Sequence, residues 1–247
     1  METFLIEHLT DLAARSDAQN IYTFSDFLSP EEQSRLLNLR RQLTPFALFG
    51  GAEGTERNMA RFGSEAQLGY EQDFPIVCLK AEPVNAKFAD ALTHRDYLGA
   101  LMSLGIERAV LGDIAVRDTV CYIFCTERIA PYVQENLTKI RHTDVRLTVC
   151  EQLPEGSLYQ TEDLRLTVSS LRLDCVAGAA VKLSRSRISD LIREKKVYLN
   201  SEICEKPDAF LEEGATFSVR GYGKFRLKEL LGNSKKGKCV VLIARFK

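Results

Sequence analysis

The chain has 247 residues, of which 45% are hydrophobic and 27% charged, a composition typical of a globular protein with one large domain or two to three small ones. No stretch approaches the roughly 18 consecutive apolar residues of a membrane span, and the early acids Glu2 and Glu7 are untypical of a secretory or organellar leader. The net charge of −1 conceals two parts of opposite charge. Residues 1–180 hold 17 Lys and Arg against 26 Asp and Glu, a net charge of −9, and residues 181–247 hold 16 against 8, a net charge of +8.

The first third of the chain predicts two helices and one short strand. Residues 1–15 repeat apolar side chains at helical spacing. Ser29–Glu32 combine a capping Ser, a Pro and two acids, which is typical of a helix start, and we expect this helix to run to about Leu43. A strand is predicted at residues 46–49. The glycine cluster at residues 50–54 lacks the Gly-Lys-Ser/Thr ending of a phosphate loop, which favours a turn.

Residues 74–150 predict a second unit in which strands and helices alternate. A helix is expected to begin at Thr93, with Asp96 in the capping-box position, and to end at Gly105. The predicted order is β-α-β-β-α-β, the pattern of ferredoxin-like and RNA-recognition domains. The remaining expected elements are strands at 74–80, 108–111, 114–116, 119–125 and 144–150, a turn at Gly112–Asp113 and a helix at 129–140.

Three apolar or aromatic side chains share one face of the strand at residues 119–125. Val120, Tyr122 and Phe124 alternate with period two, as the base-stacking aromatics of an RNA-recognition sheet do. The basic-Gly-aromatic pattern of that family's RNP1 motif is missing. We therefore expect these side chains to pack in the core, with base stacking as the alternative.

From about residue 169 the chain predicts a basic module. Helices are expected at residues 169–178 and 184–195, a strand and turn at 197–201, and strands at 216–220 and 239–243, with a glycine- and lysine-rich stretch before the last strand. On a helical wheel of the second helix, one arc about 100° wide holds cations and hydroxyls, namely Arg185, Ser186, Ser189, Arg193 and Lys196. Asp190 and Glu194 are expected on the far side. Cations beside hydroxyls predict phosphate contacts, with a solvated lysine-rich surface as the alternative.

Several linked motifs in residues 169–247 resemble the S4 RNA-binding domain. They are Ser170–Asp174, Leu183–Arg187, Leu191–Ile192, Val197, Asn200 and Lys206–Pro207. The later runs Ser218–Phe225 and Ser234–Lys238, together with Thr93–Leu101, Leu104–Ile106 and Gly112–Ile114, are similar to the YlmH family of bacterial S4-domain proteins. The resemblance spans about residues 70–247.

The resemblance implies a C-terminal S4 module, with its αL-shaped pair of helices, that binds ribosomal RNA or ribosome-bound tRNA. The implied RNA-binding residues are Arg172, Ser184, Arg185, Arg187, Lys195, Lys196, Asn200 and Lys206. Arg193 joins them from the helical wheel, and the two later motifs add the cations Arg220, Lys224, Lys235, Lys236 and Lys238. Lys224 stands where many relatives carry Arg, which keeps the charge but loses a bidentate phosphate contact.

The sequence contains no convincing catalytic or metal-binding motif. Arg172-Leu173-Asp174 resembles the catalytic motif of pseudouridine synthases, but only the S4-like module follows it, so Asp174 is expected to be structural near a helix start. His94-Arg95-Asp96 needs no catalytic explanation, because Asp96 occupies the capping-box position three residues after Thr93. The seven Cys include no CxxC pair and indicate reduced core residues. We expect no catalytic residue, metal or cofactor.

The sequence therefore predicts a non-catalytic RNA-binding protein of α+β class. The expected domains are an N-terminal helical and αβ part at residues 1–73, an RNA-recognition-like domain at 74–160 and the S4 domain at 165–247. The expected partner is rRNA or tRNA on the large ribosomal subunit, in translation or ribosome-associated quality control. A cytoplasmic monomer without a membrane or small-molecule partner is expected. The alternatives are an RNA-modifying enzyme of the pseudouridine synthase or methyltransferase type and a cell-division interaction protein.

Overall fold

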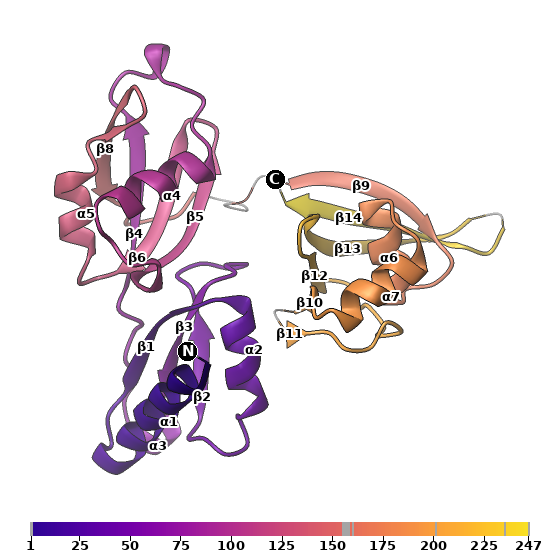
Figure 1. Cartoon of the computed structure of the whole chain (residues 1–247), viewed down its shortest axis with the longest axis horizontal. Coiled ribbons are helices and arrows are strands. Elements are labelled where there is room, and N and C mark those ends of the chain that lie inside the picture. Colours follow the sequence, from indigo (N-terminus) through magenta and orange to yellow (C-terminus); the bar gives the residue numbers. More distant parts are fainter. Residues whose placement is uncertain (1, 155–158, 160, 201, 235, 247) are drawn as a thin grey trace. The chain divides into compact units, whose positions relative to one another are not determined.

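The protein has a mixed α+β fold that divides into two compact units, Met1–Tyr159 and Gln160–Lys247 (Figure 1). The structure is a computed structural model, and it describes residues 2–154, 159, 161–200, 202–234 and 236–246. Within these ranges, no helix is both long and apolar enough to cross a membrane.

The first unit begins with a small antiparallel sheet of order β1-β3-β2. Buried side chains of the first two helices, Leu9, Ala13 and Leu36, pack on it with Phe62. Its elements are α1 (Glu2–Gln19), β1 (Thr23–Leu28), α2 (Pro30–Asn38), β2 (Phe46–Phe49), β3 (Asn58–Phe62) and α3 (Glu65–Leu68).

Helix α2 confirms its predicted start but ends before the predicted Leu43. At its start the Ser29 amide donates to Glu32 Oε2 at 2.6 Å, and the Glu32 amide donates to Ser29 Oγ at 3.3 Å, which is a capping box. At its end the Leu39 amide bonds Leu36 O at 2.9 Å, so the last turn tightens to i→i+3 bonds. The two arginines that follow are exposed and give the helix no face to bury.

A five-stranded antiparallel sheet of order β5-β6-β4-β8-β7 forms the rest of the first unit. Buried Tyr97 and Leu101 of α4, and Ala130 and Val133 of α5, pack on one face of it. The elements are β4 (Ile76–Pro83), η1 (Ala86–Phe88), α4 (His94–Ser103), η2 (Arg108–Val110), β5 (Leu111–Arg117), β6 (Val120–Thr126), α5 (Ala130–Asn136), β7 (Lys139–Ile140) and β8 (Thr143–Val149).

The predicted turn at Gly112–Asp113 is wrong, because both residues lie inside the continuous strand β5. The pairing register with β6 shifts between Leu111 and Ile114, which marks a β-bulge. The bulge coincides with a junction between the two sheets of this unit. Asp113 there accepts bonds from the amides of Glu56 and Arg57, at 2.8 and 2.9 Å, and from the Tyr159 hydroxyl at 2.6 Å.

The second face of the five-stranded sheet packs against the N-terminal part. Phe124 is 0% exposed and Tyr122 is 7% exposed, and both join a cluster with Phe27 and Met59. The backbone also approaches closely here, since a Cβ added at Gly51 would lie 2.4 Å from Phe124 Cδ1. The prediction that these aromatic side chains pack in the core is thus confirmed, and base stacking by Phe124 is excluded.

The second unit is a six-stranded antiparallel sheet of order β11-β10-β12-β13-β14-β9, with two helices on one face (Figure 1). Strands β9 and β13 were not expected. Both pair with β14, a partner distant in sequence from β9. The elements are β9 (Thr161–Val168), α6 (Leu173–Val181), α7 (Arg185–Arg193), β10 (Val197–Leu199), β11 (Glu202–Ile203), β12 (Thr216–Val219), β13 (Gly223–Asn233) and β14 (Cys239–Phe246).

We expect Phe124→Ala to lower the free energy of unfolding by about 3–5 kcal/mol, because it opens a cavity between the two sheets. Phe4→Ala is the matched control, since Phe4 is 74% exposed and its loss should cost within about 0.5 kcal/mol. Urea unfolding followed by circular dichroism measures both. Equal, small losses would contradict the buried position of Phe124.

Candidate nucleic-acid interface

The turn between α6 and α7 brings Arg185, the first residue of α7, to Asp174 of α6, which also binds Arg172. Helix α6 ends at Lys182, whose φ of 58° is left-handed, and Ser184 caps α7 by accepting the Arg187 amide at 3.2 Å. The turn is tight at Gly178, where an added Cβ would lie 2.9 Å from the Leu183 carbonyl oxygen. A larger residue there would force the two helices apart.

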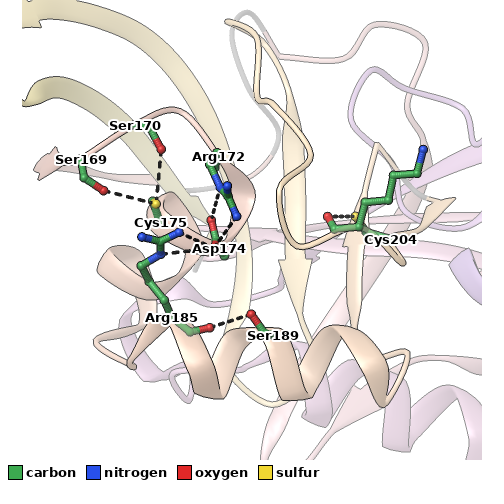
Figure 2. A network of polar contacts seen from close by, with 9 residues as sticks. Ser169, Ser170, Arg172, Asp174, Cys175, Arg185, Ser189 and Cys204 are labelled. Atoms are coloured by element: carbon green, nitrogen blue, oxygen red, sulfur yellow. Dashed lines mark hydrogen bonds and ion pairs between the residues drawn. The ribbon is translucent and has the colours of Figure 1, made fainter.

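Asp174 lies between two arginines that come from different elements (Figure 2). Arg172, just before α6, donates from Nε and Nη2 to the two carboxylate oxygens, both at 3.1 Å. Arg185, the first residue of α7, donates from Nε and Nη2 to Asp174 Oδ2 at 3.2 and 2.8 Å. The Asp174 side chain is 5% exposed, whereas those of Arg172 and Arg185 are 40% and 55% exposed. The carboxylate is buried and the two cations reach solvent.

The ionisation of Asp174 is set by two opposing influences. Burial by itself raises the pKa of the Asp174 carboxyl, but the hydrogen bonds from Arg172 and Arg185 outweigh burial and leave the pKa below its ordinary value. Asp174 is therefore a carboxylate at neutral pH. The same bonds raise the pKa of both arginines, which stay charged.

Backbone bonds to a neighbouring loop fix the start of α6. The amides of Leu173 and Asp174 donate to the carbonyls of Ala209 and Pro207, at 2.8 and 3.0 Å. These bonds satisfy two of the amides that a helix start leaves without an intrahelical partner. Arg172 also forms an isolated β-bridge with Phe210. The backbone that carries Arg172 and Asp174 is thus held by this loop as well as by helix α6.

The predicted cations at the other end of α7 pair with acids. The helical wheel placed Asp190 and Glu194 on the far side, but both lie within reach of the cations. The ion pairs are Arg193–Asp190 at 3.0 Å, Lys196–Glu194 at 2.6 Å, Arg187–Glu194 at 3.8 Å and Lys195–Glu205 at 3.8 Å. Every partner in them is at least 38% exposed. Such pairs are weak, so a polyanion can displace the acids at little cost.

Two further predicted residues, Arg220 and Asn200, bond to neighbouring segments of the sheet. The Arg220 amide donates to the Lys196 carbonyl at 2.8 Å, which joins the residue after β12 to the residue before β10. Asn200, with a left-handed φ of 50°, accepts the Thr216 amide at Oδ1 at 2.9 Å. Asn200 thus holds a turn of the sheet with one of its amide atoms.

The remaining predicted residues lie on β13, in the connection between β13 and β14, and in the segment between β11 and β12. Lys224 Nζ lies 5.0 Å from the centre of the Phe246 ring, a cation–π contact. Lys206 is exposed and precedes Pro207. Lys236 and Lys238 are exposed in the connection of the β13–β14 hairpin, which projects from its sheet in Figure 1. Lys235 lies outside the described residues.

Sequence reasoning placed Asp174 at a helix start but missed its two partners. A signal was present, because Asp174 is the only charged residue of the apolar helix α6, LDCVAGAAV. A charge on a helix that is otherwise buried needs a compensating group. Which cations supply it depends on how α6 and α7 pack.

Asp96 and the seven cysteines have structural roles in the fold. Asp96 Oδ2 accepts the amide and hydroxyl of Thr93, at 2.8 and 2.7 Å, so the capping-box prediction is confirmed. All seven cysteines are free thiols. Among the described residues, no three His, Cys, Asp or Glu side chains gather in a group that could hold a metal.

Comparison with known proteins adds three similarities. The family described as "Putative RNA-binding domain in YlmH" matches residues 70–153, the region of the five-stranded sheet. The "Ribosome-associated protein quality control protein P2" of Bacillus subtilis (strain 168) is 31% identical over 231 residues, covering 90% of this chain and 87% of that protein. The solved "Cell division protein ylmH from Streptococcus pneumoniae" has a TM-score of 0.51 at 15% identity, covering 60% of this chain and 90% of that one, which is a likeness of fold.

The low pKa of Asp174 predicts a pH-dependent contribution to stability. A carboxyl whose pKa is lowered by folding stabilises the fold above its ordinary pKa of about 4 and loses this effect as the pH falls through the folded value. At neutral pH, Asp174→Asn should reduce the free energy of unfolding by about 1–3 kcal/mol. The difference from wild type should shrink as the pH is lowered from about 5 to about 2. Urea titrations of both chains measure it, and a difference that stays constant would contradict the ion-pair geometry.

Proposed function

This chain belongs to the YlmH family, and we propose that it is a ribosome-associated RNA-binding protein that binds structured RNA through the basic face of its second unit. The observation that carries the proposal is the Arg172–Asp174–Arg185 group, which holds two partly exposed guanidinium groups at the start of α7, the helix that also carries Arg187 and Arg193. Residues 160–247 hold 18 Lys and Arg against 11 Asp and Glu, so the unit attracts a polyanion.

We further propose a three-domain organisation for this function. Residues 165–247 would form an S4 domain, with α6 and α7 as its αL-shaped pair of helices. Residues 74–160 would form an RNA-recognition-like domain, which the strand order β5-β6-β4-β8 and the antiparallel pairing support. Residues 1–73 would form the N-terminal domain that covers part of the sheet.

The RNA target that we propose is rRNA or tRNA on the large ribosomal subunit, in the quality control of translation. The name of the Bacillus subtilis relative, which is similar over nine-tenths of this chain, supports this setting. The proposed RNA-binding residues are Arg172, Ser184, Arg185, Arg187, Arg193, Lys195, Lys196, Asn200, Lys206, Arg220, Lys224, Lys235, Lys236 and Lys238. The protein would act as a cytoplasmic monomer, without catalysis, metal or cofactor.

The mechanism is electrostatic and geometric. Guanidinium and ammonium groups bind phosphate oxygens and release the counterions of the RNA, which gives affinity that depends on salt but not on base sequence. The acids that pair with α7 are exposed, and an RNA phosphate can replace them. In the five-stranded sheet any RNA contact would use exposed side chains such as Arg146 and Thr148, because Phe124 is buried.

The first test is the salt dependence of RNA affinity. For about five phosphate contacts, log K should fall with log salt at a slope of about −3.5 to −4.5. Arg185→Ala should remove about one contact, reduce the magnitude of the slope by about 0.7–0.9 and weaken binding similarly for RNAs of different sequence. Fluorescence titrations with unfractionated bacterial tRNA measure both slopes.

Arg95→Ala supplies the matched control for this titration. Arg95 is an exposed arginine on α4 of the first unit, so its loss removes the same side chain from outside the proposed surface. Its slope should equal that of wild type. Parallel lines for wild type and Arg185→Ala would place Arg185 off the phosphate-binding surface.

The second test is association with ribosomes. In sucrose gradients of bacterial lysate at low salt the chain should sediment with large subunits, and at high salt it should return to the top of the gradient, because the contacts are with phosphates. A charge-reversed chain with Arg185→Glu and Lys196→Glu should remain at the top under both conditions. Sedimentation of that variant with large subunits would contradict the proposed surface.

A further inference from the structure

We propose that Asp174 is a positioning residue that holds Arg172 and Arg185 as one phosphate-binding unit; this inference rests on the proposed function. The sequence assigned Asp174 only a structural place at a helix start. The geometry points to more, because both guanidinium groups donate to the same carboxylate through the same pair of nitrogens, Nε and Nη2 (Figure 2).

Fixing a long side chain in one conformation costs conformational entropy. An arginine side chain that is free in solution loses rotamer freedom when it binds an anion. Arg172 and Arg185 already have one edge of the guanidinium group fixed on Asp174, so they would reach RNA with that freedom already lost. The opposite edge of each fork keeps donor hydrogens, and the side chains are 40% and 55% exposed.

Asp174, which anchors both arginines, is itself held in place by backbone bonds and burial. The Asp174 amide donates to the Pro207 carbonyl at 3.0 Å, the Leu173 amide donates to the Ala209 carbonyl, and the Asp174 side chain is 5% exposed. Asp174 is therefore held by its backbone and by its surroundings. A fixed carboxylate determines where both cations lie, whereas the acids that pair with the other cations of this region are themselves exposed.

A positioning role for Asp174 and a purely electrostatic role predict different effects of its removal on RNA binding. Asp174 is negative, so its removal adds one net positive charge to a surface that binds a polyanion. If charge alone decided affinity, Asp174→Asn would bind RNA more tightly and with a steeper salt slope. If Asp174 positions the two arginines, the same change weakens binding and makes the slope shallower, since two phosphate contacts lose their preset geometry. The two explanations predict opposite signs.

The experiment is a salt titration of the full chain with unfractionated bacterial tRNA, comparing wild type, Asp174→Asn and Asp190→Asn. Asp190→Asn is the matched control, because Asp190 is an acid on α7 that pairs with one exposed arginine, at 38% and 75% exposure. We expect Asp174→Asn to raise Kd about fivefold, the order of coupling found within one hydrogen-bonded network. Asp190→Asn should bind as tightly as wild type or more tightly. Binding is compared at a temperature at which circular dichroism finds all three chains folded.

A double-mutant cycle keeps the inference testable if Asp174→Asn does not fold. Arg172→Ala and Arg185→Ala, singly and together, leave Asp174 in place. A positioned pair predicts that the double variant loses clearly less affinity than the product of the two single losses, because either loss already breaks the unit. Losses that multiply would overturn the inference, as would an Asp174→Asn chain that is folded and binds as tightly as wild type. A wild-type chain that does not bind structured RNA would overturn the proposed function itself, and the positioning role with it.

Discussion

The carboxylate of Asp174 is almost fully removed from water, and a buried negative charge must be compensated by cations and hydrogen bonds. Arg172, which lies just before α6, and Arg185, the first residue of α7, provide this compensation, and both remain partly in solvent. One interaction therefore ties α6 to α7 and at the same time places two positive groups on the surface. In the second unit the stability of the fold and the chemistry of the surface depend on the same contact.

The first unit is organised around a different buried carboxylate, Asp113. It receives backbone amides of Glu56 and Arg57 from the N-terminal part, and the β5 bulge occurs at its position. Arg57 completes this junction by donating to the Phe27 and Leu111 carbonyls, at 2.7 and 3.0 Å. The two sheets of this unit thus share polar contacts as well as the apolar cluster around Phe124. At this junction the N-terminal part covers the face of the five-stranded sheet that carries Tyr122 and Phe124.

The two units divide charge as well as structure. The acids lie mostly in the first unit, while the second carries exposed cations whose partners are exposed acids. Weak surface pairs of this kind keep the cations solvated when no ligand is bound, and salt screens them readily. The Arg172–Asp174–Arg185 group differs from them because its acid is buried. A surface that combines one fixed pair with several adaptable lysines suits a folded polyanion whose phosphates are set by its shape.

Features that depend on neighbours in the chain could be determined from the sequence alone. The caps at Ser29, Thr93 and Ser184 are of this kind, because a cap is decided by residues three positions apart. The basic character of the C-terminal end also follows from counting charges. Only the tertiary structure decided the bulge at Gly112–Asp113, the pairing of β9 with β14, and the meeting of Arg185 with Asp174. The bulge and the pairing of β9 with β14 depend on how strands meet in a sheet, and the contact of Arg185 with Asp174 depends on how α6 packs against α7. Local propensity encodes none of these arrangements.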